Sequence, residues 1–310
     1  MIKWFKSLVL ASAVGVLSAC ASDDPSPVNI VETAKSDPSF SILVEAITVA
    51  GLGDTLAGPG PFTVFAPTNE AFAALLKELG VTKDQLFADK ALLTKVLTYH
   101  GLSGSVKKAD VPAGKAIKTI EGGIFKIDPV GSDLVITDGR NRTSKIIATD
   151  IVASNGVIHA IDKVILPANK TIVETAIASN PEFSILVEAV VKAGLADALS
   201  GPGPFTVFAP TNAAFAGLLA ELNLTKDQLL NSPLLADVLK YHVVGSRVLK
   251  AEVPIGSPIT TLQGEPFTVN SALAIIDRNG RSAKIVATDV LASNGVIHVI
   301  DKVILPTLPQ

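Results

Sequence analysis

The sequence is short of the residues that build several common kinds of site. Its 310 residues include one Cys, one Met, one Trp and two Tyr, and aromatic residues make up only 5%. A single Cys excludes a disulfide-stapled scaffold and a cysteine-based zinc site. With 26 basic against 29 acidic residues there is no basic excess to neutralise phosphates. We therefore expect no nucleic-acid partner.

The sequence does have enough apolar residues for globular domains. Hydrophobic residues make up 48% of the chain, which excludes a disordered protein. The length fits roughly two domains of about 150 residues, each able to bury its own core. Beyond the N-terminus, no uninterrupted apolar stretch of about 18 residues occurs that could span a membrane.

The N-terminus is typical of an export signal. Lys3 and Lys6 precede a short apolar run, and Leu17 to Cys20 (LSAC) resembles a bacterial lipobox. We expect a lipoprotein signal peptide at 1–19, lipid attachment at Cys20 and a polar tether at 20–28. An ordinary signal peptide that happens to contain a Cys is the alternative.

The expected anchor also suggests a location. The residue after Cys20 is Ala21 rather than Asp, which favours the outer membrane in a host with two membranes. Several acyl chains on one residue would anchor the chain stably, since each buried methylene contributes about 0.8 kcal/mol. We expect an exported, lipid-anchored protein of the cell envelope.

The rest of the chain contains one unit twice. Residues 58–73 and 201–216 match at fifteen of sixteen positions, and residues 148–167 and 287–306 match at seventeen of twenty. The period of about 140 residues is too long for a solenoid repeat. We expect domains at 29–167 and 168–306, followed by a short tail at 307–310.

The second copy shows the pattern of elements most clearly. We expect helices at 172–178, 182–193 and 213–222, with Asn180 as the N-cap of the second, and a further helix that starts at Ser232-Pro233 and ends at Tyr241-His242. An apolar stripe from Phe183 to Val191 should face the core. A strand at 205–208 and a series of strands and turns after Val248 complete the unit. Helices first and strands later predict an α+β domain with a mainly antiparallel sheet.

Two long boxes in each copy resemble the signatures of the fasciclin-1 (FAS1) domain family. The first is FTVFAPTN at 62–69 and 205–212, and the second is the NGVIH-x-IDKVILP segment that begins at Asn155 and Asn294. The resemblance implies two tandem FAS1 domains, each a β-sheet wedge or sandwich packed with several short helices. It also implies a cell-surface life with adhesive partners among extracellular matrix, cell-surface or envelope proteins.

A third family mark is a Tyr-His pair, Tyr99-His100 and Tyr241-His242. The resemblance assigns this region a possible adhesive contact. The alternative is structural, because each pair ends a predicted helix, where an imidazole can interact with the last carbonyl groups.

No catalytic or metal-binding spacing occurs in the sequence. The four His residues all occupy paired repeat positions, and H-E-x-x-H, EF-hand and G-x-S-x-G patterns are absent. His159 and His298 lie within apolar strands, where a hydrogen-bonded core imidazole is the simpler interpretation. The repeated Asp residues could act as acid and base, but bonding to backbone N–H groups at turns explains them better: Asp150, Asp162, Asp289 and Asp301. We expect no enzyme, no cofactor and no metal.

Two functional hypotheses follow. The first is a non-enzymatic lipoprotein whose two FAS1 modules mediate adhesion or protein and matrix binding. The second is a carrier of an apolar ligand, a lipid or a carotenoid, suggested by the aliphatic content of the strands.

Overall fold

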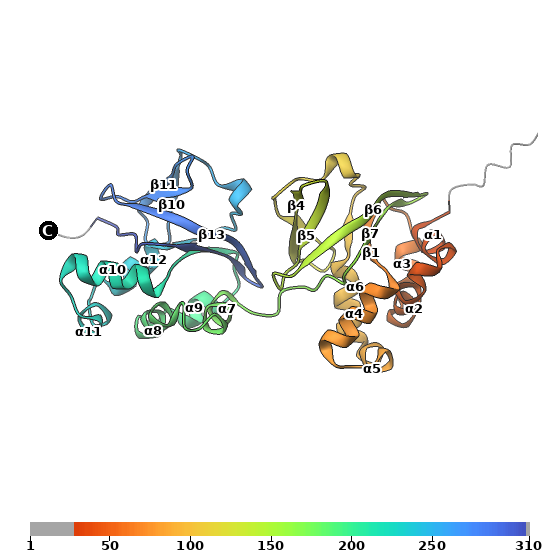
Figure 1. Ribbon diagram of the computed structural model, residues 1–310, viewed down its shortest axis with the longest axis horizontal. Helices are drawn as coiled ribbons and strands as arrows, with labels where there is room; N and C mark the ends of the chain where they lie inside the picture. Colours follow the sequence, from red (N-terminus) through yellow and green to blue (C-terminus); the bar gives the residue numbers. More distant parts are fainter. Residues whose placement is uncertain (1–27, 308–310) are drawn as a thin grey trace, which may run out of the picture.

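A computed structural model describes residues 28–307, which form two similar α+β domains joined end to end (Figure 1). The expected signal peptide, Cys20 and nearly all of the tether lie outside the described residues. No helix in the described part of the chain is long and apolar enough to cross a membrane.

Each domain is built on one seven-stranded sheet. In the first domain the strand order is β2-β1-β7-β6-β5-β4-β3, and in the second it is β10-β11-β12-β13-β14-β8-β9. The pairs β1–β7 and β8–β14 are parallel, and all other neighbouring strands are antiparallel. The mainly antiparallel sheet is therefore confirmed.

The strands of the first domain are β1 (Phe62–Pro67), β2 (Gly101–Ser103), β3 (Ile117–Lys118), β4 (Ile124–Val130), β5 (Asp133–Thr137), β6 (Thr143–Ala153) and β7 (Gly156–Ile161). Those of the second are β8 (Phe205–Pro210), β9 (Val243–Val244), β10 (Pro258–Thr260), β11 (Pro266–Val269), β12 (Ala274–Ile276), β13 (Ser282–Ala292) and β14 (Gly295–Ile300).

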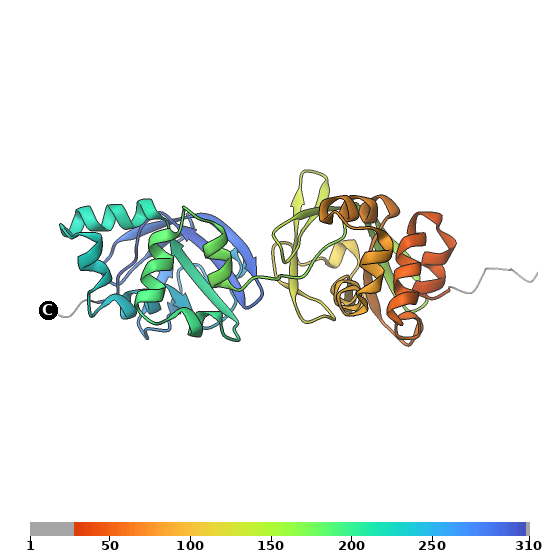
Figure 2. The same cartoon turned by 90° about the horizontal axis from the view of Figure 1, so that it is seen from below.

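The α-helices gather on one side of each sheet, as Figure 2 shows from below. The first domain has α1 (Ile30–Ser36), η1 (Pro38–Phe40), α2 (Ser41–Ala50), α3 (Gly53–Ala57), α4 (Asn69–Leu79), α5 (Lys83–Ala88), α6 (Lys90–Tyr99) and η2 (Lys108–Asp110). The second has α7 (Ile172–Ala178), α8 (Ser184–Lys192), α9 (Ala196–Ser200), α10 (Asn212–Leu222), α11 (Lys226–Leu230), α12 (Leu235–Tyr241) and η3 (Lys250–Glu252).

The two repeated sequence boxes lie side by side in the structure. They form the parallel strands β1 and β7, with Phe62 opposite Gly156 and Ile161 opposite Pro67. A Cβ built on Gly156 would lie 2.0 Å from the Phe62 carbonyl oxygen, so only glycine allows this approach. The strongest similarity between the halves thus marks the parallel pair of strands, which are second and third from one edge of each sheet.

Each domain contains two apolar clusters. One lies between the helices and the sheet, and includes Phe72 and Ile158 in the first domain. The other lies on the opposite side of the sheet, where Phe65 contacts Phe125 edge-to-face at 5.1 Å between ring centroids. The second domain repeats both arrangements, with Phe208 and Phe267 at the same 5.1 Å.

Local helix signals hold at most positions. Thr171 caps α7 and Thr225 caps α11, each in a capping box with the residue three positions later. Thr211 caps α10 by accepting a hydrogen bond from the Ala214 N–H. Each of these signals depends only on residues within one turn of the cap.

The expected start of α8 at Asn180-Pro181 is wrong. The helix begins at Ser184, and no side chain of its own N-cap residue supports it. Instead Asn212, from the FTVFAPTN box, accepts a hydrogen bond from the Ile185 N–H and donates to the Pro181 carbonyl. The predicted stripe also ends early, because Val191 is 62% exposed whereas Ala189 is fully buried.

Candidate functional sites at the Tyr-His pairs and the domain junction

The Tyr-His pairs lie in the interior. Tyr99 and Tyr241 are 0% exposed, and His100 and His242 are each 2% exposed. Each pair stands at the end of its helix, α6 or α12, directly before the short edge strand β2 or β9. The geometry therefore supports the structural alternative. An adhesive contact through these side chains stays a prediction, and their burial does not support it.

Hydrogen bonds fix one neutral tautomer for each of these imidazoles. Nδ1 of His242 lies 2.7 Å from the Val238 carbonyl oxygen one turn earlier, and Nε2 accepts a hydrogen bond from the Ile304 N–H. His100 makes the equivalent bonds to Val96 and Ile165. The proton is therefore on Nδ1, and burial lowers the pKa of both imidazoles to about 4.

The tyrosine hydroxyls join the ends of α6 and α12 to strands β4 and β11. The Tyr99 hydroxyl donates to the Ile124 carbonyl and accepts from the Gly139 N–H at 2.8 Å. Tyr241 makes longer bonds of 3.1 and 3.2 Å to the Pro266 carbonyl and the Arg278 N–H. Burial raises the pKa of Tyr241 to about 12, so both hydroxyls stay protonated and can donate.

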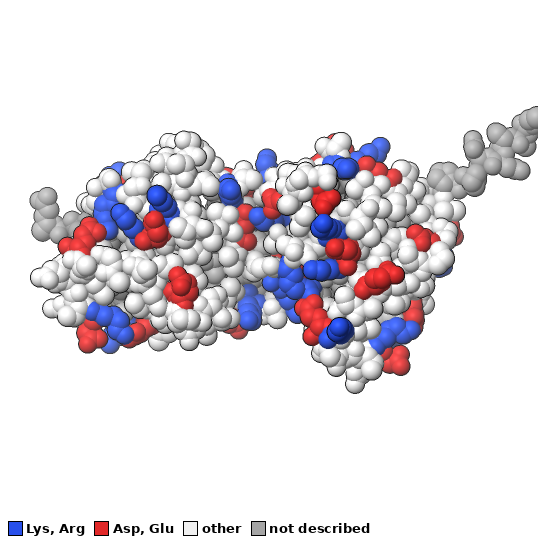
Figure 3. Space-filling view, viewed as in Figure 1, with Lys and Arg blue, Asp and Glu red and all other residues white. Residues whose placement is uncertain are grey.

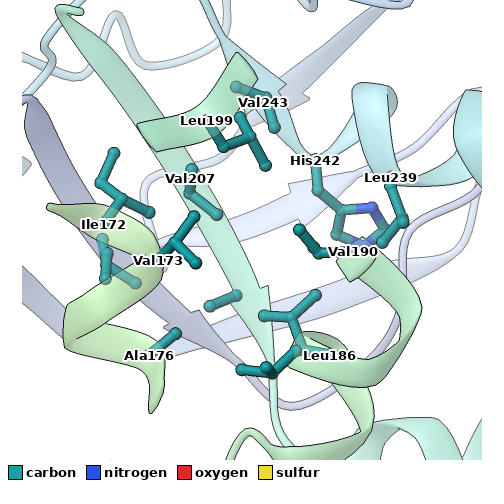
Figure 4. Close-up of a pocket in the computed structure, with 13 residues that line it drawn as sticks. Ile172, Val173, Ala176, Leu186, Val190, Leu199, Val207, Leu239, His242 and Val243 are labelled. Carbon is teal, nitrogen blue, oxygen red and sulfur yellow. The ribbon is translucent and has the colours of Figure 1, made fainter. Parts of the chain in front are cut away.

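Small apolar pockets adjoin both histidines. Figure 4 shows the one in the second domain, where His242 faces aliphatic side chains of α7, α8 and β8. It and its counterpart beside His100 each have a volume of only about 40 Å³. Pockets for drug-sized ligands have volumes of about 300 to 1,000 Å³. These two pockets therefore do not support the carrier hypothesis.

The repeated Asp and Asn residues serve the backbone, as expected. Asp162 and Asp301 accept hydrogen bonds from the N–H groups of Lys145 and Lys284. Asn294 accepts from the Ile172 N–H and donates to the carbonyls of Leu199 and Gly201, so it ties the β13–β14 turn to two helices. Asn155 does the same in the first domain.

The strand histidines are core residues, as predicted. His159 and His298 are 1% and 0% exposed. In each, Nε2 bonds a backbone carbonyl, and Nδ1 accepts the N–H of the Asp at the register irregularity of the preceding strand, Asp150 or Asp289. Within residues 28–307, no group of three or more His, Cys, Asp or Glu is placed to hold a metal ion.

The junction between the domains contains a partly buried charge network that sequence reasoning missed. The Lys126 ammonium lies 2.8 Å from an Asp289 carboxylate oxygen and 3.0 Å from one of Asp128. The other Asp289 oxygen accepts the Lys250 N–H. Burial alone would lower the pKa of Lys126, but the bonds to Asp289 and Asp128 raise it overall.

A carboxamide also joins the two domains. Asn141 accepts a hydrogen bond from the Leu291 N–H at 2.6 Å and donates to the Leu291 carbonyl at 3.0 Å. This pairing is equivalent to one residue of an antiparallel ladder. Beside it, Ile124 of the first domain packs against Leu249, Leu291 and Val296 of the second.

One signal in the sequence marks the residues that form this junction. At the equivalent positions, the second domain has Thr268 for Lys126 and Gly280 for Asn141, and the first has Lys107 for Leu249. Several of the residues that form the junction therefore lie at positions where the two copies differ. Those differences could have been read from the sequence, but their meeting in space could not.

A comparison with models of known protein families identifies both domains. The model of the fasciclin domain matches residues 38–167 and again residues 181–306. The chain belongs to the fasciclin domain family. Its two domains are thus fasciclin domains, each with the seven-stranded sheet and helices described above.

Relatives of this fasciclin protein occur in animals and bacteria. It is 33% identical over 254 residues to the transforming growth factor-beta-induced protein ig-h3 of Sus scrofa, a match that covers 81% of this chain and 35% of that protein. It is 42% identical over 156 residues to protein sll1483 of Synechocystis, covering 49% of this chain and 79% of that protein. The chain thus spans about a third of the animal relative.

A solved structure of a FAS1 domain pair from the insect cell adhesion molecule fasciclin I is also similar. The match has a TM-score of 0.41 and 19% sequence identity, and it covers 89% of this chain and 95% of that one.

Proposed function

We propose that this protein is a non-enzymatic envelope lipoprotein whose two fasciclin domains mediate adhesion or binding to matrix or surface proteins. The observation that carries the proposal is the junction. Asn141, Lys126 and an apolar cluster hold two complete fasciclin domains as one elongated unit. A unit of this kind presents two similar surfaces at a fixed separation, and bivalent contact can raise avidity without new interactions.

Membership of the fasciclin family supports an adhesive role over a carrier role. The sequence resemblance associates this family with contact between cells and matrix, and the apolar pockets beside the histidines are small. The partner proteins of this chain would meet surfaces outside the Tyr-His pairs, since those side chains are buried.

An attachment assay tests the proposal. Cells that display the full chain are compared with cells that display a version without the second domain, on a surface coated with the matrix those cells deposit. We expect deletion of residues 168–306 to weaken attachment strongly. Equal attachment of both cell lines would contradict an adhesive role for the tandem.

The lipid anchor is a separate part of the proposal and needs its own test. It is supported by the LSAC sequence at 17–20, which holds the chain's only Cys. Mass spectrometry of protein extracted from its own membranes should show acyl chains on Cys20. The Cys20→Ser variant should appear in the soluble fraction, and an unmodified Cys20 in the membrane would overturn the anchor.

A further inference from the structure

The junction contains a second feature beside the contacts between the domains. A cleft of about 290 Å³ opens beside the linker, between α6 and the β3–β4 turn of the first domain and the end of β13 in the second. Two basic side chains line it, Lys95 and Arg247. On the face seen in Figure 3, Lys and Arg side chains gather where the two domains meet.

Arg247 is the unusual member of this cleft. It is half-buried, yet its guanidinium has no hydrogen bond or ion pair with any residue in 28–307. Lys95 lies 3.7 Å from Glu121, whose other carboxylate oxygen accepts the Gly123 N–H. The lining therefore carries two positive charges against one negative charge, and Arg247 is unmatched.

Comparison of the two copies shows that these charges are specific to the junction. The counterpart of Arg247 in the first domain is Ser105, and the counterpart of Lys95 in the second is Asp237. The fold itself thus needs neither charge. Other departures between the copies, such as Asn141, bond the two domains together, whereas Arg247 extends into the cleft without a partner.

The remaining lining suits a small acid with an apolar substituent. Ser293, an exposed residue with a hydroxyl donor, also lines the cleft, and Ile124, Leu291 and Ala292, each at most 6% exposed, form the apolar part of the lining. An arginine guanidinium binds a carboxylate with two parallel N–H···O bonds, the strongest common geometry for this pair. Clefts between domains are also preferred places for ligand sites.

We propose that this cleft binds a carboxylate that carries a short aliphatic group, with Arg247 as its principal ligand and Lys95 as a supporting charge. The carboxylate comes from a small free acid or from the C-terminal residue of a partner protein. In the second case the proposal rests on the binding function proposed above and names the chemistry of the partner.

A matched pair of probes tests the chemistry. N-acetylvaline and N-acetylvalinamide differ only in the acid group, and binding of each to the purified full-length chain is followed by titration calorimetry or NMR. We expect the acid to bind and the amide to bind at least about tenfold more weakly, because a charged hydrogen-bond partner is lost. Equal binding of the two, or no binding of the acid, would overturn the proposal.

Two variants locate the site. Arg247→Ser installs the residue that the first domain has at this position, and should weaken binding of N-acetylvaline by about ten- to hundredfold. Lys192→Ser removes one positive charge from an exposed position at the end of α8 and should leave binding unchanged. Unchanged affinity in Arg247→Ser would refute the site, and circular dichroism shows whether each variant is folded.

Longer probes separate the two sources of the acid. A hexapeptide ending in valine with a free carboxylate is compared with the same peptide amidated. If the free-acid peptide binds and the amidated peptide binds at least about tenfold more weakly, the carboxylate comes from a partner's C-terminus. If N-acetylvaline binds and the free-acid peptide does not, the ligand is a small free acid. Loss of cell attachment on deletion of 168–306 is measured independently, so failure of the cleft and failure of the adhesive role are distinguishable.

Discussion

At the scale of single residues, the two histidines at the helix ends act as acceptors that must stay neutral. Nε2 of His100 and of His242 receives a backbone N–H, so a second ring proton would point at that donor. This contact and the burial of the ring favour the neutral form in the folded state. Unfolded chains have no such preference, and their histidines titrate near 6.5.

We therefore predict that acid destabilises the protein through these two residues. Because the folded pKa is about 4, lower than in the unfolded chain, their stabilisation is complete above about pH 6.5 and falls as the pH drops toward 4. The loss should approach about 3 kcal/mol for each histidine. Urea unfolding at a series of pH values measures it.

The variant His100→Gln/His242→Gln supplies the control for this pH dependence. It should unfold more easily at pH 7 but lose less stability between pH 6.5 and 4 than the parent chain. If both chains lose the same free energy over that interval, other groups control the acid sensitivity.

The hydroxyls of Tyr99 and Tyr241 should contribute different amounts to stability, although they occupy equivalent positions in the two domains. Tyr99→Phe leaves the buried Gly139 N–H and Ile124 carbonyl without partners, which should cost about 1–3 kcal/mol. Tyr241→Phe removes longer, partly buried bonds and should cost less. Denaturant unfolding of both variants checks the order, and a larger loss for Tyr241→Phe would contradict it.

At the scale of elements, the turn between the last two strands stabilises the helix layer as well as the sheet. The Asn294 side chain bonds the first N–H of α7 and two carbonyls at the end of α9. The sequence predicts a turn at Asn294-Gly295 from its local propensity. It does not predict these three contacts, because their partners lie 93 to 122 residues away.

We predict that Asn294→Asp is strongly destabilising. A carboxylate oxygen would replace the amide donor opposite the carbonyls of Leu199 and Gly201, so two partly buried hydrogen bonds become repulsive contacts. The expected loss is about 2–4 kcal/mol in urea unfolding. Asn231→Asp, at an exposed side chain with one local bond, should change stability little, and similar losses in the two variants would refute the role of Asn294.

At this scale, the sequence predicts those contacts whose two partners are close along the chain and misses those whose partners are far apart. Caps such as Thr171 and Thr225 act within three residues, so the pattern identifies them correctly. The start of α8 depends on Asn212, which lies 27 residues after the Ile185 N–H that it caps, so a local signal at Asn180 misleads. The interior position of the Tyr-His pairs likewise depends on strands more than 20 residues later.

At the scale of the whole molecule, the junction should decide whether the two domains move as one. We predict that Lys126→Thr/Asn141→Gly, which installs the second domain's own residues, loosens the contact. Asn141 has a φ of 62°, which glycine adopts without strain, so the first domain should stay folded. Trypsin should then cleave faster after Lys170 in the linker.

A charge-matched control keeps this experiment specific. Lys145→Thr removes an exposed ion pair with Asp133 of the same domain, and should leave cleavage at Lys170 unchanged. If the double variant is cleaved no faster than the parent chain, the bonds of Asn141 and Lys126 do not hold the domains together.

The junction also differs in its side chains from the two outer faces of the pair. It is a head-to-tail contact between unlike faces, and contacts of this type can continue into filaments when every unit carries both faces. Here the outer end of the second domain has Thr268 and Gly280 in place of the lysine and asparagine, and the free face of the first domain has Lys107 in place of the buried leucine. The side chains that join the two domains are therefore not repeated at the equivalent positions on the outer faces of the pair.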